Sequence, residues 1–440
     1  MKKDSYIQKF IRTIFILTLV IPLQQKCFHK NAIKTDNSSI NSSILNAPKP
    51  DDLKNNISLS TTNSPENYEK ELASGKKKAV RIEPEGGFVF SVSNEQLQML
   101  SEKNPAFTIQ ARLSRGIENC EADIESYQIS ESKQSNFEEI MGGKMKPDSF
   151  LIAKKEDGKI IAIPYQVNNK VAEKIKLLFS QLEGKKLDKN DCKEIEKVIE
   201  ADPGMPLVNF AASGCWQKVG EIQKAHLFID KELEVNPSNP EALLAKADIL
   251  LSVKDKSRAL EKIAEALFYY PSWEAPRKYL NIKSEIGCKI RSTSFDPKIF
   301  IDVNKNGVVI AGYLKSQKWL EPYALCKAAF RYCPSVRTSF GMKAFPYKLS
   351  LFEELVCLEI TAKEGKDLSN ADENEDENLK MLLSAFNNDD LIPFSIFEII
   401  GRLNPNYMKF LPEDIKNMVL DYIKSYIIVD EKGTKSCNMQ

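Results

Sequence analysis

Three prolines, Pro203, Pro237 and Pro271, are spaced at intervals of 34 residues. Each one ends a stretch whose apolar residues recur at the three- and four-residue intervals of two amphipathic helices. A proline ring cannot continue the hydrogen-bond ladder of a helix, so the spacing marks the ends of successive helix pairs. Because one such pair cannot bury its apolar face alone, this region is expected to form a stack of helical hairpins.

The stretch from Pro240 to Trp273 carries the pattern most completely. Two helices of one hairpin approach closely only where their side chains are small, so Ala247 and Ala259 are expected to face each other. Larger apolar residues then fill the spaces around them. In length and pattern the stretch resembles a tetratricopeptide repeat. The residues that carry the resemblance are Leu243, Ala247, Leu250, Ala259, Ile263, Ala266 and Pro271.

Two preceding stretches repeat the scheme in the same register. In residues 206–239 the matching positions hold Ser213, Trp216, Ala225, Ile229 and Pro237. In residues 172–205 Phe179 and Asp191 replace two of the small residues, so this unit is interpreted as a divergent or capping repeat. The resemblance covers about residues 172–285. It implies a short stack of hairpins whose curved surface binds other proteins or peptides.

The resemblance also implies which side chains line that surface, because the first helix of each hairpin forms the concave face. The residues expected there are Leu207, Phe210, Gln217, Lys218, Glu241, Leu244, Asp248 and Leu251. We expect the groove to hold either a protein or peptide partner or the chain's own C-terminal domain. The family's clamp for chaperone tails is not expected, because its positions hold Phe210, Gly214, Ala245 and Tyr279.

Residues 1–27 begin with basic side chains and continue into the apolar run Ile14–Leu23. This run is shorter than the roughly 20 residues that a membrane-spanning helix needs, and it fits the apolar region of a signal peptide. We therefore expect either a signal peptide or an N-terminal membrane anchor, with Cys27 as a weak candidate for lipidation. Both alternatives predict an exported protein that is periplasmic or associated with the cell envelope.

The remaining chain divides by composition and pattern. Residues 28–78 are polar and poor in large apolar side chains, which predicts a disordered tether. Residues 79–167 alternate strand-like and helix-like stretches, as in a small mixed α/β domain. The repeats occupy residues 168–290, a mostly helical domain with an N-terminal β-hairpin occupies residues 291–430, and residues 431–440 form a tail. The expected fold class is α+β, predominantly α.

Turn and capping signals predict individual elements within these domains. Asp-Gly and Asn-Gly pairs between apolar runs predict hairpin turns, and a serine followed three residues later by Gln or Glu predicts a helix start at Ser93 and at Ser350. The expected strands are residues 86–93, Phe107–Leu113, and the hairpins Phe150–Val167 and Lys298–Leu314. The expected C-terminal helices are Gln317–Tyr332, Ser350–Lys363, Leu379–Phe386, Phe394–Leu403 and Glu413–Ile428.

Charge and residue usage argue against several functions. With 62 basic and 61 acidic residues, the chain has no basic excess to hold a phosphate backbone, so nucleic acid is not an expected partner. The histidines are His29 and His226, and the second is expected on the surface or in the groove of a repeat. No catalytic, cofactor-binding or metal-binding residue is therefore assigned. The expected function is protein–protein interaction or assembly.

The alternative is a hydrolase-type enzyme with its site in the C-terminal helical domain. Carboxylates such as Glu353 and Glu354 can serve as acid and base, beside Lys348 or Arg337. Adjacent glutamates on a helix, however, are expected to point in different directions and to face water.

The nine cysteines are scattered without the spacing of a known disulfide framework. Cys326 and Cys333 lie seven residues apart on a predicted helix, roughly 10 Å along its axis, so they are not expected to bridge each other. In an oxidising envelope one or two longer-range disulfides are expected. The sequence does not choose the pairs.

Overall fold

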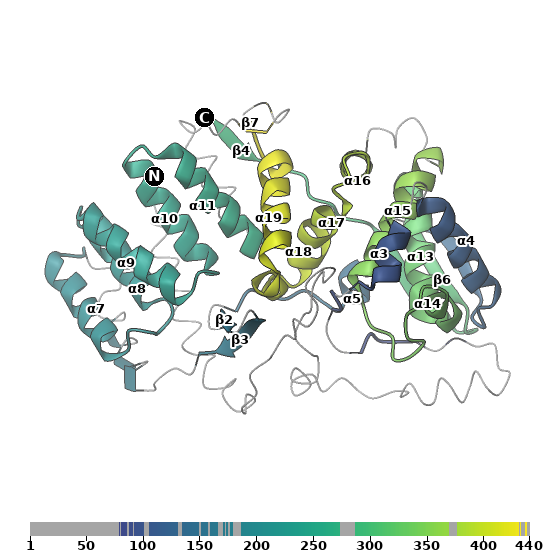
Figure 1. Cartoon of the computed structure of the whole chain (residues 1–440), viewed down its shortest axis with the longest axis horizontal. Coiled ribbons are helices and arrows are strands. Elements are labelled where there is room, and N and C mark those ends of the chain that lie inside the picture. The colour runs from purple at the N-terminus through teal and green to yellow at the C-terminus, as the bar shows by residue number, and fades with distance from the viewer. Residues whose placement is uncertain are drawn as a thin grey trace.

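The computed structural model describes most of residues 79–430, together with residues 432, 436 and 437. The gaps are residues 80, 86–87, 91, 101–104, 131–133, 149–150, 157–158, 166–169, 172, 175–176, 179–185, 273–286 and 369–375. The expectations for residues 1–78 lie outside the described residues. The fold is α+β and predominantly α, as the sequence predicts. Figure 1 shows an elongated molecule with helical hairpins at one end and a sheet covered by helices at the other.

The hairpins form a helical array of α7 (Lys189–Ala201), α8 (Val208–Lys218), α9 (Ile222–Val235), α10 (Pro240–Ser252) and α11 (Lys256–Tyr269). Each of these helices packs on the next along the chain, and α8 also contacts α10. The predicted stack of helix pairs is therefore present (Figure 1). It continues without a break into the C-terminal helices, because α19 (Glu413–Tyr422) packs on α11.

Small residues and side-chain caps explain the helix pairs of the array. Ala247 and Ala259 are both fully buried, as close packing between α10 and α11 requires. Asn239 begins α10 by accepting hydrogen bonds from two backbone N–H groups of the first turn. Asp191 does not loosen α7, because it lies in the first turn and forms a capping box with Asp188. Phe179 lies outside the described residues.

Four disulfides join segments that are distant in the sequence, where one or two were expected. Cys326 and Cys333 do not bridge each other, in agreement with their spacing, and each pairs with another cysteine. The pairs are Cys120–Cys333, Cys192–Cys215, Cys288–Cys437 and Cys326–Cys357. Disulfides persist in oxidising compartments, so the chain belongs outside the cytoplasm.

The sheet combines segments from before and after the array. β5 (Ile299–Val303) and β6 (Val309–Leu314) form the predicted antiparallel hairpin. β1 (Ile124–Ile129), which the sequence analysis missed, pairs in parallel with β6. Cys120–Cys333 adds a covalent link between the same two regions. The expected mixed domain over residues 79–167 is therefore not separate, because its first part shares a sheet with the C-terminal domain.

The prediction of a strand at Phe107–Leu113 was wrong, because these residues lie within α4 (Pro105–Glu118). Ile109 and Leu113 are buried four residues apart, while Gln110 between them is exposed, which is helical periodicity. β1 was not predicted because its sequence, IESYQI, is polar. Most of it is exposed at the edge of the sheet.

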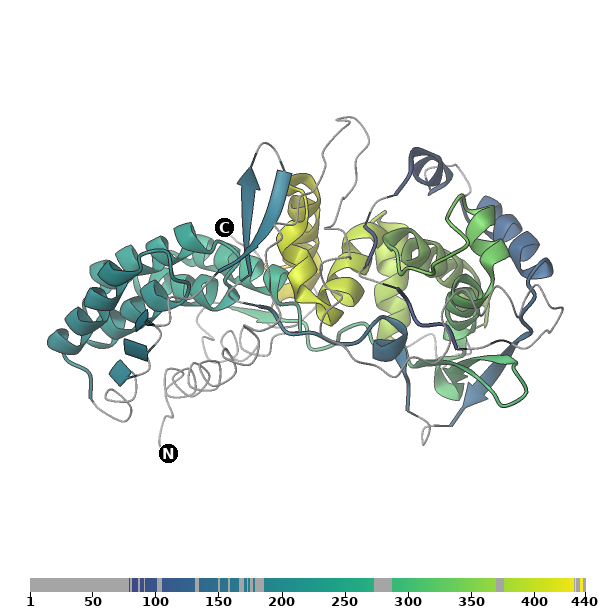
Figure 2. The same ribbon diagram turned by 90° about the horizontal axis from the view of Figure 1, so that it is seen from below.

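The other predicted hairpin is also present, as β2 (Leu151–Glu156) and β3 (Lys159–Pro164). Figure 2 shows it standing beside the C-terminal helices, where both strands contact η6 (Pro405–Phe410). The buried ammonium of Lys409 fastens this contact by donating to the backbone oxygens of Asp148 and Leu151.

The segment before α3 (Asn94–Leu100) is extended and forms the bridge Val89–Ser350, and Glu85 N donates to Tyr347 O at 2.8 Å. The predicted capping box at the start of this helix is confirmed. Ser93 N donates to the Gln96 side chain at 2.9 Å, and Gln96 N donates to Ser93 Oγ at 3.2 Å.

The C-terminal helices follow the predicted order with some changes. The predicted first helix is divided at residue 320, and the predicted last helix ends before a short strand that pairs with β4 (Cys288–Ile290). The elements are η3 (Lys315–Leu320), α13 (Glu321–Tyr332), α14 (Pro334–Ser339), α15 (Leu351–Leu368), α16 (Glu377–Asn387), α17 (Leu391–Phe394), η5 (Ser395–Ile400), α18 (Gly401–Leu403), η6, α19, η7 (Ile423–Ile427) and β7 (Ile428–Asp430).

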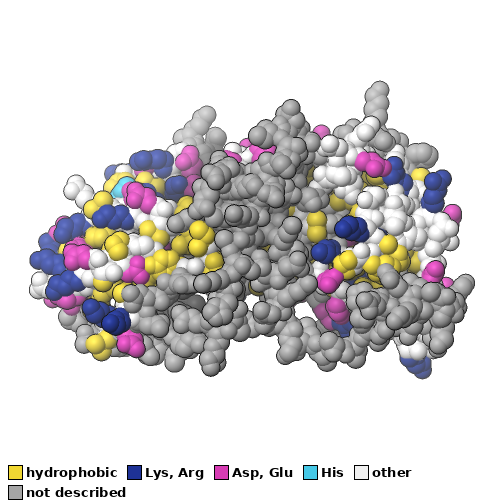
Figure 3. Space-filling model, turned by 60° about the horizontal axis from the view of Figure 1, so that its bottom comes forward, with side chains coloured by type: hydrophobic (Ala, Val, Ile, Leu, Met, Phe, Trp, Pro, Cys, Tyr) yellow, Lys and Arg dark blue, Asp and Glu magenta, His cyan; other side chains and the backbone are white. Residues whose placement is uncertain are grey.

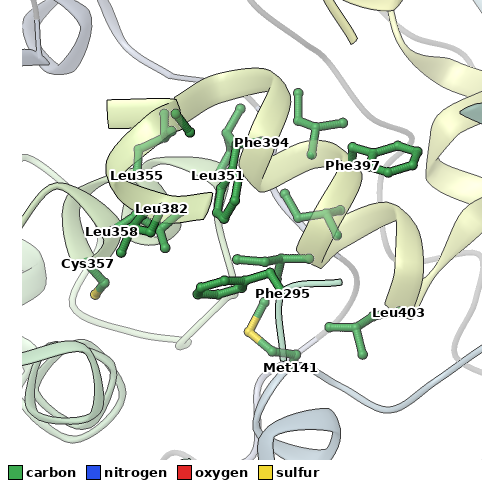
Figure 4. Packing of buried hydrophobic residues seen from close by; sticks show 14 of the residues in the cluster. Met141, Phe295, Leu351, Leu355, Cys357, Leu358, Leu382, Phe394, Phe397 and Leu403 are labelled. Atoms are coloured by element: carbon green, nitrogen blue, oxygen red, sulfur yellow. The ribbon is translucent and has the colours of Figure 1, made fainter. Parts of the chain in front are cut away.

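The main hydrophobic core surrounds α15 and includes residues of the sheet, of α13 and of the helices that follow α15. Figure 4 shows Leu351 and Leu355 of α15 packed against Phe394, with Phe295 beside them. This cluster extends through α11 and the inner face of α10, so the last hairpin of the array shares its core with the C-terminal domain. A smaller cluster holds α7, α8 and α9 together around Trp216.

Candidate functional site

The first candidate site is the groove, by which we mean the face of α8 and α10 that carries the eight predicted binding residues. One hydrogen bond joins the two helices across it, from Gln217 Nε2 to Asp248 Oδ2 at 2.5 Å. Phe210, Glu241 and Leu251 are partly exposed. Figure 3 shows hydrophobic side chains gathered over the array among charged ones.

Not all of the predicted groove residues are available to a ligand. Lys218 is exposed, whereas Leu207 and Leu244 are 7% and 5% exposed and belong to the protein interior. Leu207 precedes α8 in a left-handed backbone conformation with φ 73°, which turns its side chain away from the regular helical register. These two residues support the packing of the groove rather than contact with a partner.

A buried glutamate side chain stabilises the N-terminal end of α8, where the groove begins. Glu232 of α9 is fully buried and accepts hydrogen bonds from Leu207 N at 2.9 Å, Phe210 N at 3.4 Å and Asn239 Nδ2 at 3.1 Å. The two backbone groups are at the N-terminus of α8, where helices have N–H groups without partners. The sequence contained a signal for this role, because Glu232 occupies the position that Ala266 holds one repeat later.

Two carboxyl groups near the groove have raised pKa values. Burial raises the pKa of Glu232 to about 7, although its three hydrogen-bond donors act in the opposite direction. Desolvation also raises the pKa of Glu241 to about 7, and the two acids repel each other when both are ionised. The groove therefore gains negative charge as the pH rises through neutrality.

His226 takes part in a polar cluster that joins two adjacent hairpins. Its Nδ1 lies 3.0 Å from Asp230 Oδ2 on α9, and Lys246 Nζ of α10 lies 3.1 Å from His226 Nε2 and also binds Asp230. The histidine side chain is 37% exposed, as expected for a surface residue. Among its described contacts there is no hydroxyl or thiol nucleophile, so this arrangement supports packing between repeats.

The second candidate site is the pair Glu353 and Glu354 on α15. The expectation that they face water was wrong, because both are fully buried. Both bind Lys327 of α13, whose Nζ donates to Glu353 Oε1 and, at 3.2 Å, to Glu354 Oε2. Tyr347 OH donates to Glu353 Oε1 at 3.0 Å, and Tyr323 OH donates to Glu354 Oε1. We call these five residues the buried charge cluster.

The partners that the sequence suggested for the two glutamates do not bind them. Arg337 instead donates to the backbone oxygens of Phe330, Arg331 and Ala344. Lys327 was missed because a single lysine within a helix is normally expected to face solvent. The capping box is also incomplete: Glu353 N donates to Ser350 Oγ at 3.1 Å, but the Glu353 side chain turns into the cluster.

Burial and the neighbouring charges together set the pKa values of Glu353 and Lys327. Burial raises the pKa of Glu353, with partial opposition from Lys327. Burial alone would lower the pKa of Lys327, but the two carboxylates outweigh it and raise that pKa. Every member of the cluster is 2% exposed or less. An external substrate therefore has no access to these groups, and they do not form the surface acid–base pair of a hydrolase.

Comparisons with known proteins add no assignment to either site. No family model matches the chain, and no curated protein matches it. Within the described part of the chain, no three histidine, cysteine, aspartate or glutamate side chains converge as metal ligands. The helices in those same ranges are all too short or too polar to cross a membrane.

Proposed function

We propose that the chain is an exported, envelope-associated protein that acts in protein–protein interaction or assembly through its tetratricopeptide-like array. The observation that carries the proposal is the pairing of α8 and α10 by Gln217 and Asp248, which gives the first helices of two hairpins a common face. Apolar and charged side chains are mixed on this face, as in grooves that bind peptides. The periplasm or cell envelope fits a chain with four disulfides.

The position of the C-terminal domain supports an external partner over an internal one. The domain packs on α11, the second helix of the last hairpin, through α19, η6 and η7. Phe210 and Gln217 of α8 remain partly exposed. The chain's own C-terminal helices therefore extend the array and leave the α8 part of the groove to a protein or peptide partner. Tethering to the membrane through residues 1–27 would hold this surface at the envelope.

The test is proximity labelling in the envelope fraction with wild type and two variants. Phe210→Glu places a charge in the groove, whereas Leu227→Glu places one on α9, where Leu227 is already 52% exposed. We expect Phe210→Glu to lose labelled partners that wild type and Leu227→Glu retain, while all three proteins melt at the same temperature. Identical partners for the three proteins would contradict the assignment of the groove.

A further inference from the structure

The buried charge cluster places an amine against a carboxyl group in a site closed to water. Lys327 Nζ touches Glu353 Oε1, so the carboxyl carbon Cδ lies one bond beyond a contacted oxygen. Lys327 is 1% exposed and Glu353 is fully buried. Reacting groups held in this way have effective concentrations far above any in solution. Burial of the ion pair is costly as well, because both charges have lost their hydration.

We propose that Lys327 and Glu353 condense to an intramolecular amide that links α13 to α15. The Nζ–Cδ bond forms as the Cδ–O bond breaks, and the carboxyl oxygen leaves as water with two protons. The reaction needs no oxidant, nucleotide or metal. Nitrogen and carbon keep their oxidation states, and the water released accounts for every atom lost.

Glu354 supplies the base that this step requires. Its Oε2 lies 3.2 Å from Lys327 Nζ, so it is placed to take a proton from the ammonium group. Burial raises the pKa of Glu353, which favours the protonated carboxyl whose hydroxyl can leave. Proton transfer from Lys327 to Glu354 frees the lone pair of the amine, which can then attack Cδ of Glu353.

The surroundings also provide partners for the product. Tyr347 OH, which donates to both Glu353 oxygens at 3.0 and 3.2 Å, remains in place to donate to the amide oxygen. The Glu354 carboxyl is placed to accept from the amide N–H. The product is therefore a buried amide with both polar groups satisfied, in place of a buried ion pair. Exclusion of water from the site disfavours its hydrolysis.

The amide would lie beside an existing covalent link between the same helices. Cys326, which precedes Lys327, is bonded to Cys357, one helical turn beyond Glu353. The disulfide fixes α13 against α15 and thereby limits the motion of the amine relative to the carboxyl group. The two links differ in chemistry, because reduction breaks the disulfide and leaves an amide intact.

The test is peptide mapping of the full wild-type chain after denaturation, reduction, alkylation and digestion with trypsin. Amidation blocks cleavage after Lys327, so the expected product is residues 319–331 joined to residues 349–363. Its mass is the sum of the two peptides less one water molecule. Cleavage after Lys327 with recovery of residues 349–363 only as a free peptide would overturn the proposal. This readout needs no variant, so it does not depend on any variant folding.

Two matched variants then test the role of Glu354. Glu354→Gln keeps the size of the side chain and removes the base, and we expect the linked fraction to form about 100-fold more slowly. Glu359→Gln makes the same change on α15 at a residue that is 8% exposed and does not bind Lys327, so it should link at the wild-type rate. Linkage in Glu354→Gln as fast as in Glu359→Gln would overturn the assignment of the base.

Discussion

Replacement of Glu232 by glutamine should change how the stability of the chain depends on pH. In the folded state burial raises the pKa of Glu232 from its ordinary value of 4.5 to about 7. The folded protein therefore binds a proton more readily than the unfolded chain between these values. The stability that this proton contributes is fully present below pH 4.5 and is lost as the pH rises through 7.

The size of the effect follows from the shift. One pKa unit corresponds to about 1.4 kcal/mol, so raising the pH from 5 to 8 should cost the wild type about 2.5 kcal/mol through this group alone. Glu232→Gln has no such proton. Its unfolding free energy, relative to that of the wild type, should therefore rise by about 2.5 kcal/mol between the two pH values. Glutamine retains one acceptor for the N–H groups of Leu207 and Phe210.

The assay is urea denaturation of both proteins at pH 5 and pH 8, followed by circular dichroism. Glu234→Gln makes the same change at an exposed position of α9, so it is the matched control and should follow the wild type. If wild type and Glu232→Gln lose stability equally between pH 5 and pH 8, the assignment of Glu232 as a desolvated cap is refuted.

Four further predictions concern contacts within the fold and are tested by chemical or thermal denaturation. Asn136→Ala should lower the unfolding free energy by about 1–3 kcal/mol, because Asn136 is bonded to both Ile301 N and Ile301 O at the edge of β5; an unchanged midpoint would contradict this. Replacing glycine by alanine normally stabilises a helix, but a Cβ at position 365 would lie 2.7 Å from Trp319 O. We therefore expect Gly365→Ala to lower the melting temperature, and a higher melting temperature would contradict this. Arg337→Met removes the donors to three backbone oxygens and should lower the unfolding free energy by about 3 kcal/mol, with a smaller loss for Arg337→Lys. Equal losses for the two variants would contradict a specific role for the planar guanidinium group. Replacing Cys192 and Cys215 together by alanine should cost about 3 kcal/mol, and no loss would show that α7 is held by packing alone.

The features that the sequence predicted are those determined by neighbouring residues. The hairpin turn at Asn306-Gly307 requires a backbone with positive φ, and Gly307 has φ 81°. The capping box at Ser93 and Gln96 is likewise local. The array was predictable because each helix of a hairpin packs on the next one in sequence.

The features that the sequence did not predict depend on distant partners. β1 is polar and becomes a strand because β6 pairs with it from 185 residues away, as in the pair Ile124 and Val309. Lys327 is buried because Glu353 and Glu354 meet it on another helix. Eight paired cysteines allow many pairings, and spacing does not distinguish them. Leu244, which was expected in the groove, is buried in the cluster that α10 shares with the C-terminal domain.

The order of the cysteines has a consequence for how the chain matures. If the chain is exported N-terminus first, Cys120 reaches the oxidant long before Cys333, its native partner 213 residues later. Where Cys27 has been removed or lipidated, Cys192 is the next cysteine to follow Cys120, and oxidation in order of appearance would pair these two and leave Cys215 without its partner. Correct pairing must then be recovered by thiol–disulfide exchange, which takes about minutes to hours when it is uncatalysed. The yield of native protein should therefore depend on a disulfide isomerase, and an oxidase alone should trap mispaired chains.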